Sequence, residues 1–496
     1  MLELTALDLG RDPIPALAVP VCEDRSIHSH PSLEALIRRL EAYPEFKGKS
    51  EQILILHGLE DAGARRAIFL GLGEADAVDA GALRNLAGRA VKAAMEAELT
   101  ELAIAAPDSD AVAPEKGEIF AAMLEGAGLA NHLSDDYKSE RKKRLLDRIR
   151  LFAPSEPGAA HADLAARAEA LAAGTHLARE WVNRPANDKT PERYAAAIVE
   201  AAEAVGLKTT VMDEAELRER GFGAMLAVAQ GSESKGKLVI LEYEPELNMT
   251  GGTPERTVVL VGKGVTFDTG GYNLKIGGSM SGMKADMGGS AAVAAALVTA
   301  ARLRPKDRIV GLTPLVENMV SGNAVRPGDV FKSYLGKTVE IGNTDAEGRL
   351  ILIDAMAYAV ETYQPDLMID FATLTGACLM GLGERIAGVF TKDDALAEAI
   401  VAAGTATGDR CWRLPLPDDY KEYLKSDLAD ISNMPSVRWG GAITAALFLS
   451  EFVGDARWAH IDIAGPVQAK KGTAVSPPGA TGFGVRLIFD LLNRLG

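Results

Sequence analysis

The chain has 496 residues and a mass of 52.4 kDa, more than a single hydrophobic core usually spans, so we expect two or three domains. Hydrophobic residues make up 47% and charged residues 25% of the sequence, which excludes a mainly disordered chain. Acidic side chains outnumber basic ones by 69 to 53, and the resulting net charge of −16 argues against a general affinity for nucleic acids or anionic membranes.

The cysteine content and the hydropathy pattern indicate a cytoplasmic protein. Cys22, Cys378 and Cys411 lie too far apart in the sequence to form a disulfide framework or a zinc-binding pair, and we interpret them as small buried apolar residues. The first 15 residues contain acidic side chains and no long apolar stretch, unlike a secretory signal. The sequence has no run of about 18 uncharged apolar residues, so we expect no transmembrane helix.

In the first third of the chain, short β-type runs alternate with helical stretches, which predicts a small α/β domain. The strands are expected at residues 52–56, 67–72, 101–105 and 148–152, and the main helix at residues 80–97. A break that contains Pro and Gly, at residues 153–158, is typical of a domain boundary. We therefore predict an N-terminal α/β domain over residues 1–158, without recognisable chemistry and with a role in assembly or regulation.

The remainder, residues 159–496, is predicted to form a larger catalytic domain, which opens with an Ala-rich helix at residues 159–182. Its apolar runs are nearly continuous and alternate with helices, which is typical of a mostly parallel sheet flanked by helices. Strands are expected at residues 237–243, 257–261, 308–315, 338–341, 366–371 and 458–463, and helices at 288–303, 347–362 and 443–452. Because such sheets bind ligands at the carboxyl ends of their strands, polar residues after the strands are the candidates for chemistry.

Carboxylates and basic side chains are concentrated in Gly-rich segments near the ends of the predicted strands. The carboxylates are Asp268, Asp286, Asp345 and Glu347, and the basic residues are Lys263, Lys275 and Arg349. Any one of the aspartates could simply cap a helix, but capping does not explain the coincidence of the whole set. Clustered carboxylates need compensating cations, and four of them suffice for a site with two divalent ions such as Mg²⁺, Mn²⁺ or Zn²⁺.

At these residues the sequence resembles the leucyl aminopeptidase family of two-metal metallopeptidases. The octapeptide at residues 343–350, Asn-Thr-Asp-Ala-Glu-Gly-Arg-Leu, matches the family signature throughout, and residues 262–289 keep its Lys, Asp, Lys, Met and Asp at the family's spacings. Further similar segments are residues 183–187, 321–329, 372–377 and 480–484. The resemblance extends from about Ala170 to the C-terminus, and the preceding residues are only broadly similar.

The resemblance implies a metal-dependent aminopeptidase that removes a neutral, Leu-like N-terminal residue from short peptides by means of a water molecule activated by two metal ions. Lys263 and Asp286 are the ligands implied for one ion and Asp345 for the other, while Asp268 and Glu347 would contact both. The implied cofactors are two divalent ions per chain, with Mn²⁺ or Zn²⁺ expected, and a bicarbonate ion as general base. The implied assembly is a homohexamer.

The resemblance also implies two catalytic residues and a specificity pocket. Lys275 would polarise the scissile carbonyl group, and Arg349 would hold the bicarbonate ion. The pocket for the N-terminal side chain would be lined by small or apolar residues, namely Met283, Thr373, Leu374, Gly376, Ala464 and Val467. His460 and Asp462 lie close to Ala464 in the sequence, and we interpret both as structural residues.

Two alternatives stay open. A two-metal hydrolase of phosphate esters would use the same carboxylates, but the sequence contains no complete phosphate-binding loop. An accessory DNA-binding role, which some members of the family have, is disfavoured by the net charge of −16.

Overall fold

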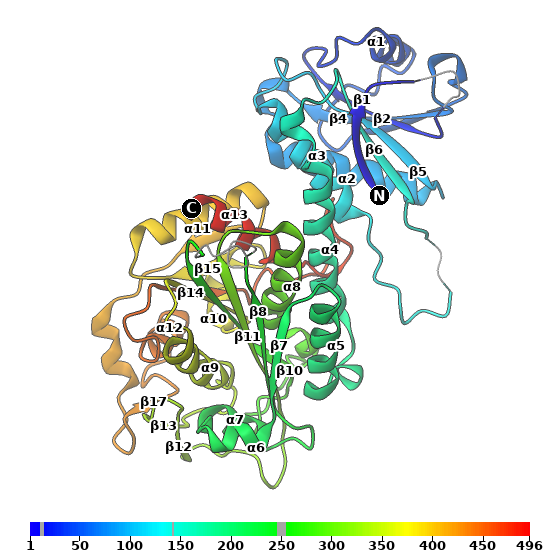
Figure 1. Cartoon of the computed structure of the whole chain (residues 1–496). Coiled ribbons are helices and arrows are strands. Elements are labelled where there is room, and N and C mark those ends of the chain that lie inside the picture. The colour runs from blue at the N-terminus through cyan, green and yellow to red at the C-terminus, as the bar shows by residue number, and fades with distance from the viewer. Residues whose placement is uncertain (10–13, 141–142, 246–253) are drawn as a thin grey trace. The chain divides into compact units, whose positions relative to one another are not determined.

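The computed structural model describes residues 1–9, 14–140, 143–245 and 254–496. The chain folds into two compact units (Figure 1), which are described separately here. The first unit contains Met1–His176 together with Lys470–Pro478, and the second contains Leu177–Ala469 together with Gly479–Gly496. None of the helices in the described ranges combines the length and the hydropathy that a membrane span requires.

The first unit is built on a six-stranded sheet. Its strands are β1 (Leu2–Ala6), β2 (Leu17–Cys22), β3 (Ile53–His57), β4 (Arg66–Gly73), β5 (Glu101–Ala105) and β6 (Arg148–Ala153). The strand order is β1-β6-β5-β2-β4-β3, and all neighbours are parallel except β3 and β4. Helix α1 (Pro31–Arg38) packs on one face of the sheet, and helices α2 (Ala80–Glu96) and α3 (Lys116–Ala130) pack on the other. The predicted α/β architecture is therefore confirmed.

The four predicted strands and the predicted helix α2 agree with the structure to within about two residues, but β1, β2, α1 and α3 were not predicted. Strand β2 lies between β5 and β4 although it contains Pro20, which has no N–H group to donate to a neighbouring strand. The predicted domain boundary after residue 158 lies between β6 and helix α4 (Leu164–Asn183), and it stays a prediction.

The second unit contains a nine-stranded sheet, and the predicted mostly parallel arrangement is confirmed. Its strands are β7 (Lys208–Met212), β8 (Lys237–Tyr243), β9 (Thr257–Gly262), β10 (Gly264–Asp268), β11 (Arg308–Asn318), β14 (Leu367–Ala372), β15 (Ala387–Phe390), β16 (Cys411–Arg413) and β18 (Trp458–Asp462). The order is β16-β15-β18-β14-β9-β11-β8-β7, and β10 also pairs with β11. The central strands β18, β14, β9 and β11 are mutually parallel, whereas β8 is antiparallel to β11 and β15 is antiparallel to β18.

Helices cover both faces of this sheet (Figure 1). Helix α8 (Gly288–Leu303) packs on one face of the sheet. A Cβ atom at Gly311 of β11 would lie only 2.7 Å from the side chain of Leu297 in this helix, which shows how closely the helix and the strand approach. The neighbouring Val310 and Leu312 point to the opposite face and join an apolar cluster with α7 (Gly223–Ala229), α9 (Gly348–Tyr363) and α12 (Gly441–Ser450). The remaining helices of this unit are α5 (Pro191–Glu203), α6 (Glu214–Glu219), α10 (Gly376–Leu382), α11 (Asp394–Thr407) and α13 (Val485–Leu495).

The N-terminus of α8 approaches the ends of β9 and β14 very closely. A Cβ atom at Gly289 would lie 1.9 Å from the carbonyl oxygen of Phe371 in β14, and one at Gly262 would lie 2.5 Å from the carbonyl oxygen of Gly289. Only glycine permits backbones to approach so closely. The turn before α8, which carries Asp286, is thereby fixed beside the carboxyl ends of the strands.

The strands β7, β15 and β16 were not predicted, and two predicted features of this unit are wrong. The strand predicted at residues 338–341 does not belong to the main sheet, because β13 (Thr338–Glu340) pairs with β12 (Val330–Lys332) and β17 (Ile431–Ser432) in a separate three-stranded sheet. The segment Gly264–Asp268, expected to be part of a Gly-rich turn, is the strand β10. Both differences arise because these segments pair with strands that are distant in the sequence. Local sequence patterns do not identify the strand with which a segment pairs.

Candidate metal centre

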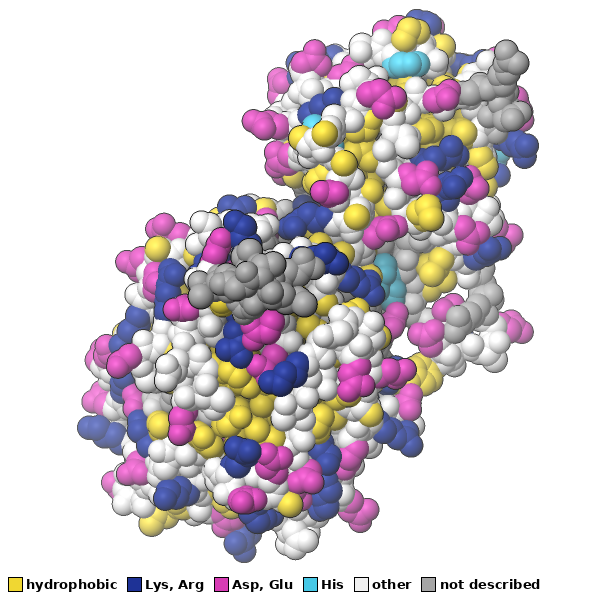
Figure 2. Space-filling view, viewed as in Figure 1, with side chains coloured by type: hydrophobic (Ala, Val, Ile, Leu, Met, Phe, Trp, Pro, Cys, Tyr) yellow, Lys and Arg dark blue, Asp and Glu magenta, His cyan; other side chains and the backbone are white. Residues whose placement is uncertain are grey.

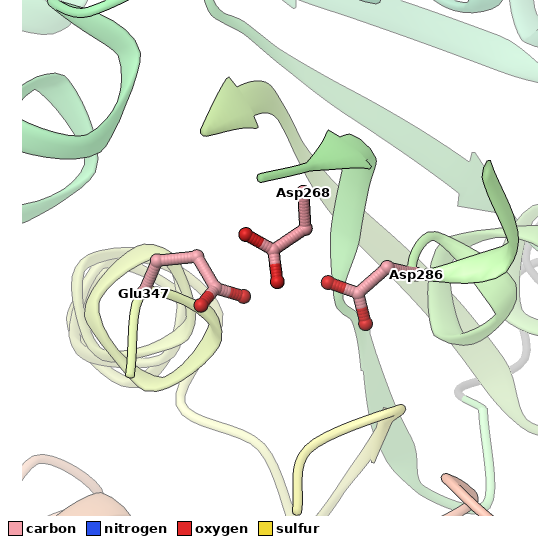
Figure 3. A group of neighbouring side chains, drawn as sticks. All are labelled: Asp268, Asp286 and Glu347. Atoms are coloured by element: carbon pink, nitrogen blue, oxygen red, sulfur yellow. The ribbon is translucent and has the colours of Figure 1, made fainter. Parts of the chain in front are cut away.

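Three buried carboxylates converge in the second unit, and each comes from a different element (Figure 3). Asp268 is the last residue of β10, Asp286 follows the 3-10 helix η7 (Met283–Ala285), and Glu347 immediately precedes α9. One oxygen atom of each residue lies within 4.8 Å of those of the other two. The fold therefore concentrates acidic groups at a place where water cannot screen their repulsion.

Lys263 neutralises one side of this cluster. It lies between β9 and β10, and its Nζ atom is 2.8 Å from Oδ1 of Asp286 and 2.9 Å from Oε1 of Glu347. The same Nζ atom donates a hydrogen bond to the backbone carbonyl of Thr373 at 2.8 Å. The three donor positions of this buried ammonium group are thus matched by three acceptors.

Lys275 neutralises the other side of the cluster. Its Nζ atom lies 2.8 Å from Oδ2 of Asp268 and 2.6 Å from Oδ1 of Asp345. Asp345 is the most exposed of the carboxylates, with 33% of its side-chain surface accessible, and it joins the cluster through Lys275. The structure thus brings together the five residues predicted as metal ligands and the predicted catalytic residue Lys275.

The pKa values of the cluster reflect burial and mutual repulsion. Burial, followed by the charge of Asp268, raises the pKa of Glu347 to about 8, although Lys263 opposes this shift. Burial also raises the pKa of Asp286 to about 6, against the lowering effect of Lys263. Burial alone would lower the pKa of Lys263, but the surrounding carboxylates outweigh it and raise this pKa above its usual value. At neutral pH the cluster therefore holds protons that a bound cation would displace.

The donor atoms of the cluster fit a divalent cation. Oδ1 of Asp286 accepts hydrogen bonds from Nζ of Lys263 and Oγ1 of Thr373, whereas Oδ2 is buried and accepts none from the described residues. A buried carboxylate oxygen without a donor is costly unless a cation contacts it. Several carboxylate oxygens together with one amine nitrogen are ligands that suit Mn²⁺ or Zn²⁺.

The loop between β13 and α9, which carries two of the predicted ligands, is held by the buried side chain of Asn433. Its Oδ1 atom accepts the backbone N–H groups of Gly342 at 2.8 Å and Asn343 at 3.3 Å. Its Nδ2 atom donates to the carbonyl of Asn343 at 2.8 Å. One amide side chain therefore provides the loop backbone with hydrogen bonds that a neighbouring strand would otherwise supply.

Arg349 lies in the first turn of α9 and is buried. Its Nη1 atom donates to the backbone carbonyl of Asn433 at 2.7 Å, and its guanidinium carbon lies 5.9 Å from the ring centre of Phe448. Its Nε atom is buried and has no hydrogen-bond partner among the described residues. Burial lowers the pKa of Arg349 to about 10, so the group stays charged at neutral pH. A buried cation with an unpaired donor is a favourable contact for a small anion.

Asp462 connects two segments that contain predicted pocket residues. Its Oδ1 atom accepts the backbone N–H groups of Leu374 and Ala464, both at 3.1 Å, and its Oδ2 atom accepts the hydroxyl of Thr375 at 2.7 Å. These contacts fix the loop before α10 beside the loop after β18, which agrees with the structural interpretation of Asp462.

The other predicted pocket residues lie on neighbouring segments. A Cβ atom at Gly288 would lie 2.3 Å from Cγ2 of Val467 and 3.7 Å from Cγ2 of Thr373, so both residues line the start of α8. Met283 is the first residue of η7, and Gly376 is the first residue of α10.

His460 forms a buried pair with a carboxylate in the core of the sheet. Its Nδ1 atom lies 2.6 Å from Oδ1 of Asp370, whose Oδ2 atom accepts a hydrogen bond from the indole of Trp458 at 2.8 Å. The imidazole ring stacks on Phe390, with 5.7 Å between ring centres. These contacts are those of a core residue, as the sequence interpretation expects.

The sequence reasoning missed two asparagines that contact the centre. Nδ2 of Asn318 donates to Oδ1 of Asp268 at 2.8 Å, and Asn433 holds the loop described above. A polar residue just beyond the predicted apolar strand at residues 308–315 is a signal that could have identified Asn318. Asn433 follows the two-residue strand β17, and its neighbours in the sequence give no comparable signal.

Comparison with known protein families supports this description along nearly the whole chain. Residues 176–489 match the family described as "Cytosol aminopeptidase family, catalytic domain". Residues 23–141 match the family described as "Cytosol aminopeptidase family, N-terminal domain".

Individual relatives give the same result. The probable cytosol aminopeptidase of Roseiflexus castenholzii is 42% identical over 453 residues, which cover 90% of this chain and 91% of the relative. That of Synechococcus sp. (strain CC9605) is 45% identical over 453 residues, which cover 90% and 89%. Among solved structures, the bottromycin maturation enzyme BotP in complex with Mn has a TM-score of 0.85 and 36% identity, and the match covers 97% of this chain and 99% of BotP.

The raised pKa values predict that metal binding weakens as the pH falls. Burial and mutual repulsion raise the pKa values of Glu347 and Asp286, and the surrounding carboxylates raise the pKa of Lys263, so the centre holds more protons as the pH falls and an incoming cation must displace them. We expect the Mn²⁺ affinity of the metal-free protein to fall by about tenfold or more per pH unit between pH 7 and pH 6. Titration calorimetry in buffers of different ionisation enthalpy measures the affinity and counts the released protons. A pH-independent affinity without proton release would contradict the assignment.

Proposed function

The chain belongs to the cytosol aminopeptidase family and is a metal-dependent aminopeptidase, and we propose that it removes neutral, Leu-like N-terminal residues from short peptides. The observation that carries this proposal is the buried group of Asp268, Asp286 and Glu347, whose ion-pair partners among the described residues are Lys263 and Lys275. Such a group is suited to binding divalent cations.

The proposed metal ligands are residues that form the ion pairs of the cluster, and their assignment to two ions is the one that the family resemblance implies. Lys263 and Asp286 would hold one ion, Asp345 would belong to the other, and Asp268 and Glu347 would contact both. Two bound divalent ions would supply an activated water molecule and a Lewis acid for the scissile carbonyl group. The Mn in the related BotP structure supports Mn²⁺ as the first ion to test, with Zn²⁺ as the second.

Lys275 is the proposed electrophilic residue. Burial lowers its pKa, but Asp268 and Asp345 outweigh burial and raise the pKa above its usual value, so the side chain is an ammonium group at neutral pH. Metal ions that take over these two carboxylates would leave the ammonium group free to donate a hydrogen bond to the substrate carbonyl oxygen. Such a donor stabilises the negative charge that develops on this oxygen in the transition state.

Arg349 is the proposed anchor of the general base. No histidine or free carboxylate among the residues described at the centre is available to take a proton from the attacking water molecule. The unpaired Nε atom of the buried guanidinium group supports bicarbonate as its ligand.

The proposed specificity rests on the small or apolar residues around Thr373 and Val467. Thr373 contacts the predicted ligand Asp286 directly, so a substrate side chain beside it would lie next to the metal centre. The free amino group of the substrate would be recognised by the acidic centre, because a cationic or metal-bound amine fits there and an acylated amine does not.

The proposed assembly is a homohexamer in the cytosol, as the name of the relatives suggests for the location. Several large apolar side chains are exposed in the single chain, among them Met380 at 87%, Trp439 at 63% and Trp412 at 60%. These residues are the candidate positions for contacts with another copy of the chain. On the face shown in Figure 2, basic side chains are scattered among acidic ones, which does not favour the alternative DNA-binding role.

Replacing Lys275 or Arg349 tests the catalytic roles. We expect K275A to lower kcat for a leucine anilide by about 10²–10³-fold, because the oxyanion loses a charged donor. R349A is expected to lower it by about 10²-fold or more, because the general base loses its anchor. Elemental analysis should still find Mn²⁺ in both variants. The exposed Lys392 provides the control, since K392A should keep the rate within about twofold. Wild-type rates in K275A and R349A would refute the assigned roles.

A substrate panel tests the reaction type. Acetylation of the N-terminus should lower kcat/KM for a Leu peptide by more than about 10³-fold, since the site would lose its amine partner. Peptides that begin with Leu or Met should be better substrates than those that begin with Glu, because the small or apolar pocket residues provide no cation for a buried carboxylate. Release of inorganic phosphate from phosphate esters without peptide cleavage would instead support the other two-metal hydrolase.

Light scattering coupled to size-exclusion chromatography tests the assembly. A homohexamer would have six times the 52.4 kDa mass of the chain. Substitution of an exposed apolar residue by a charged one, such as W412E, should shift the mass towards smaller species if that residue lies in an interface. A monomeric mass for the wild-type protein would contradict the hexamer.

A further inference from the structure

We propose that Asn318 is a positioning residue that orients Asp268 for metal binding and couples it to the loop carrying Asp345. The inference rests on the proposed function, because it takes Asp268 as a metal ligand. Asn318 itself is not expected to contact either ion or the substrate.

The register of two strands brings Asn318 to Asp268. β10 and β11 are parallel, and Asp268 lies opposite Asn318 in this pairing. The preceding pair, Phe267 and Glu317, lies on the other face of the strands, where Glu317 accepts a hydrogen bond from the hydroxyl of Ser232 at 2.5 Å. The alternation of side chains along β11 therefore directs Asn318, and not its acidic neighbour, to the cluster.

The amide of Asn318 joins two acceptors. Its Nδ2 atom donates to Oδ1 of Asp268 at 2.8 Å and to the backbone carbonyl of Thr344 at 3.0 Å. Both neighbours are pure acceptors, so only the NH₂ group of the amide can face them, and both of its hydrogen atoms are used. The side chain is 1% exposed, so water does not compete for these hydrogen bonds.

The two oxygen atoms of Asp268 consequently have different roles. Oδ1 accepts from Asn318 and from the backbone N–H of Gly270, both at 2.8 Å. Oδ2 is left to face Lys275, at 2.8 Å. Because both donors to Oδ1 are neutral and cannot lose a proton in the physiological pH range, they fix the carboxylate without neutralising the charge that a cation requires.

The contact with Thr344 couples this carboxylate to the signature loop. Thr344 directly precedes Asp345, and its hydroxyl donates to the carbonyl of Gly270 at 2.6 Å while it accepts from the N–H of Asn273 at 2.9 Å. The backbone carbonyl of Asn318 in turn accepts the N–H of Thr269 at 3.0 Å. The segment after β10 and the loop before α9 therefore share Asn318 as their common fixed point.

Loss of the amide donors should weaken metal binding without unfolding the protein. Asp268 could then rotate about its side-chain bonds, and the loop with Asp345 would lose one of its anchors. Residues that hold metal ligands in this way typically contribute about 10–100-fold to metal affinity. N318L removes both donors at nearly constant volume and without adding charge.

The test uses the full chain and has a matched control in the same strand. Thr313 of β11 is fully buried, and its hydroxyl donates to the carbonyl of Val239 at 3.2 Å, away from the cluster. Mn²⁺ binding to the metal-free wild type, N318L and T313V is measured by competition with a chelator. Thermal unfolding of the metal-free proteins is recorded alongside.

We expect N318L to bind Mn²⁺ about 10–100-fold more weakly than wild type, and T313V to remain within about twofold. The Mn²⁺ concentration for half-maximal aminopeptidase activity should rise in N318L by the same factor, an effect that a general loss of stability would not produce. Should N318L not fold, N318A is judged by the same criterion.

Each result separates the inference from the function on which it rests. If a folded N318L or N318A binds Mn²⁺ as tightly as T313V, Asn318 is not a positioning residue and the inference is wrong. If the wild-type protein itself binds no Mn²⁺, or if D268N binds it as tightly as wild type, the proposed metal centre is wrong instead.

Discussion

The arrangement of the second unit depends on the repulsion among three carboxylates that share one buried site. Asp268, Asp286 and Glu347 lie within 4.8 Å of one another, at a distance and depth where like charges interact strongly. Burial raises the pKa values of Asp286 and Glu347. Lys263 lies less than 3 Å from Asp286, and Lys275 lies less than 3 Å from Asp268. The backbone must therefore bring lysines and carboxylates from separate segments to one point and hold them there.

The sheet and two helices meet this requirement. Asp268 is delivered by β10, Lys263 by the break between β9 and β10, Asp286 by the turn before α8, and Glu347 by the residue before α9. The glycines at the start of α8 allow its N-terminus to reach the strand ends, so that the turn with Asp286 lies beside them. Neutral amides complete the arrangement, because Asn318 fixes a carboxylate and Asn433 fixes a loop without adding charge.

Much of this could be predicted from the sequence, and the reasons for the rest are physical. Long apolar runs and Ala-rich segments are local signals of strands and helices. The strand β8 and the helix α8 accordingly have the predicted bounds. Partner choice is not local, which explains why β10 was missed and why the strand at residues 338–341 was assigned to the wrong sheet. The carboxylates and lysines of the centre were identified because their types and spacings are unusual. Asn318 and Asn433 were missed because an isolated asparagine carries no such signal and its role exists only in three dimensions.

The lysine pairs also bear on the order of folding and metal binding. In many metal centres the ligands can be assembled only when the ion neutralises them, and the apo chain is then unfolded. Here the ammonium groups of Lys263 and Lys275 lie 2.6–2.9 Å from the carboxylates and offset part of their charge. A chain that supplies such counter-charges of its own is expected to fold before it binds metal. Under the proposed function, one divalent ion would then be exchanged for another without unfolding of the polypeptide.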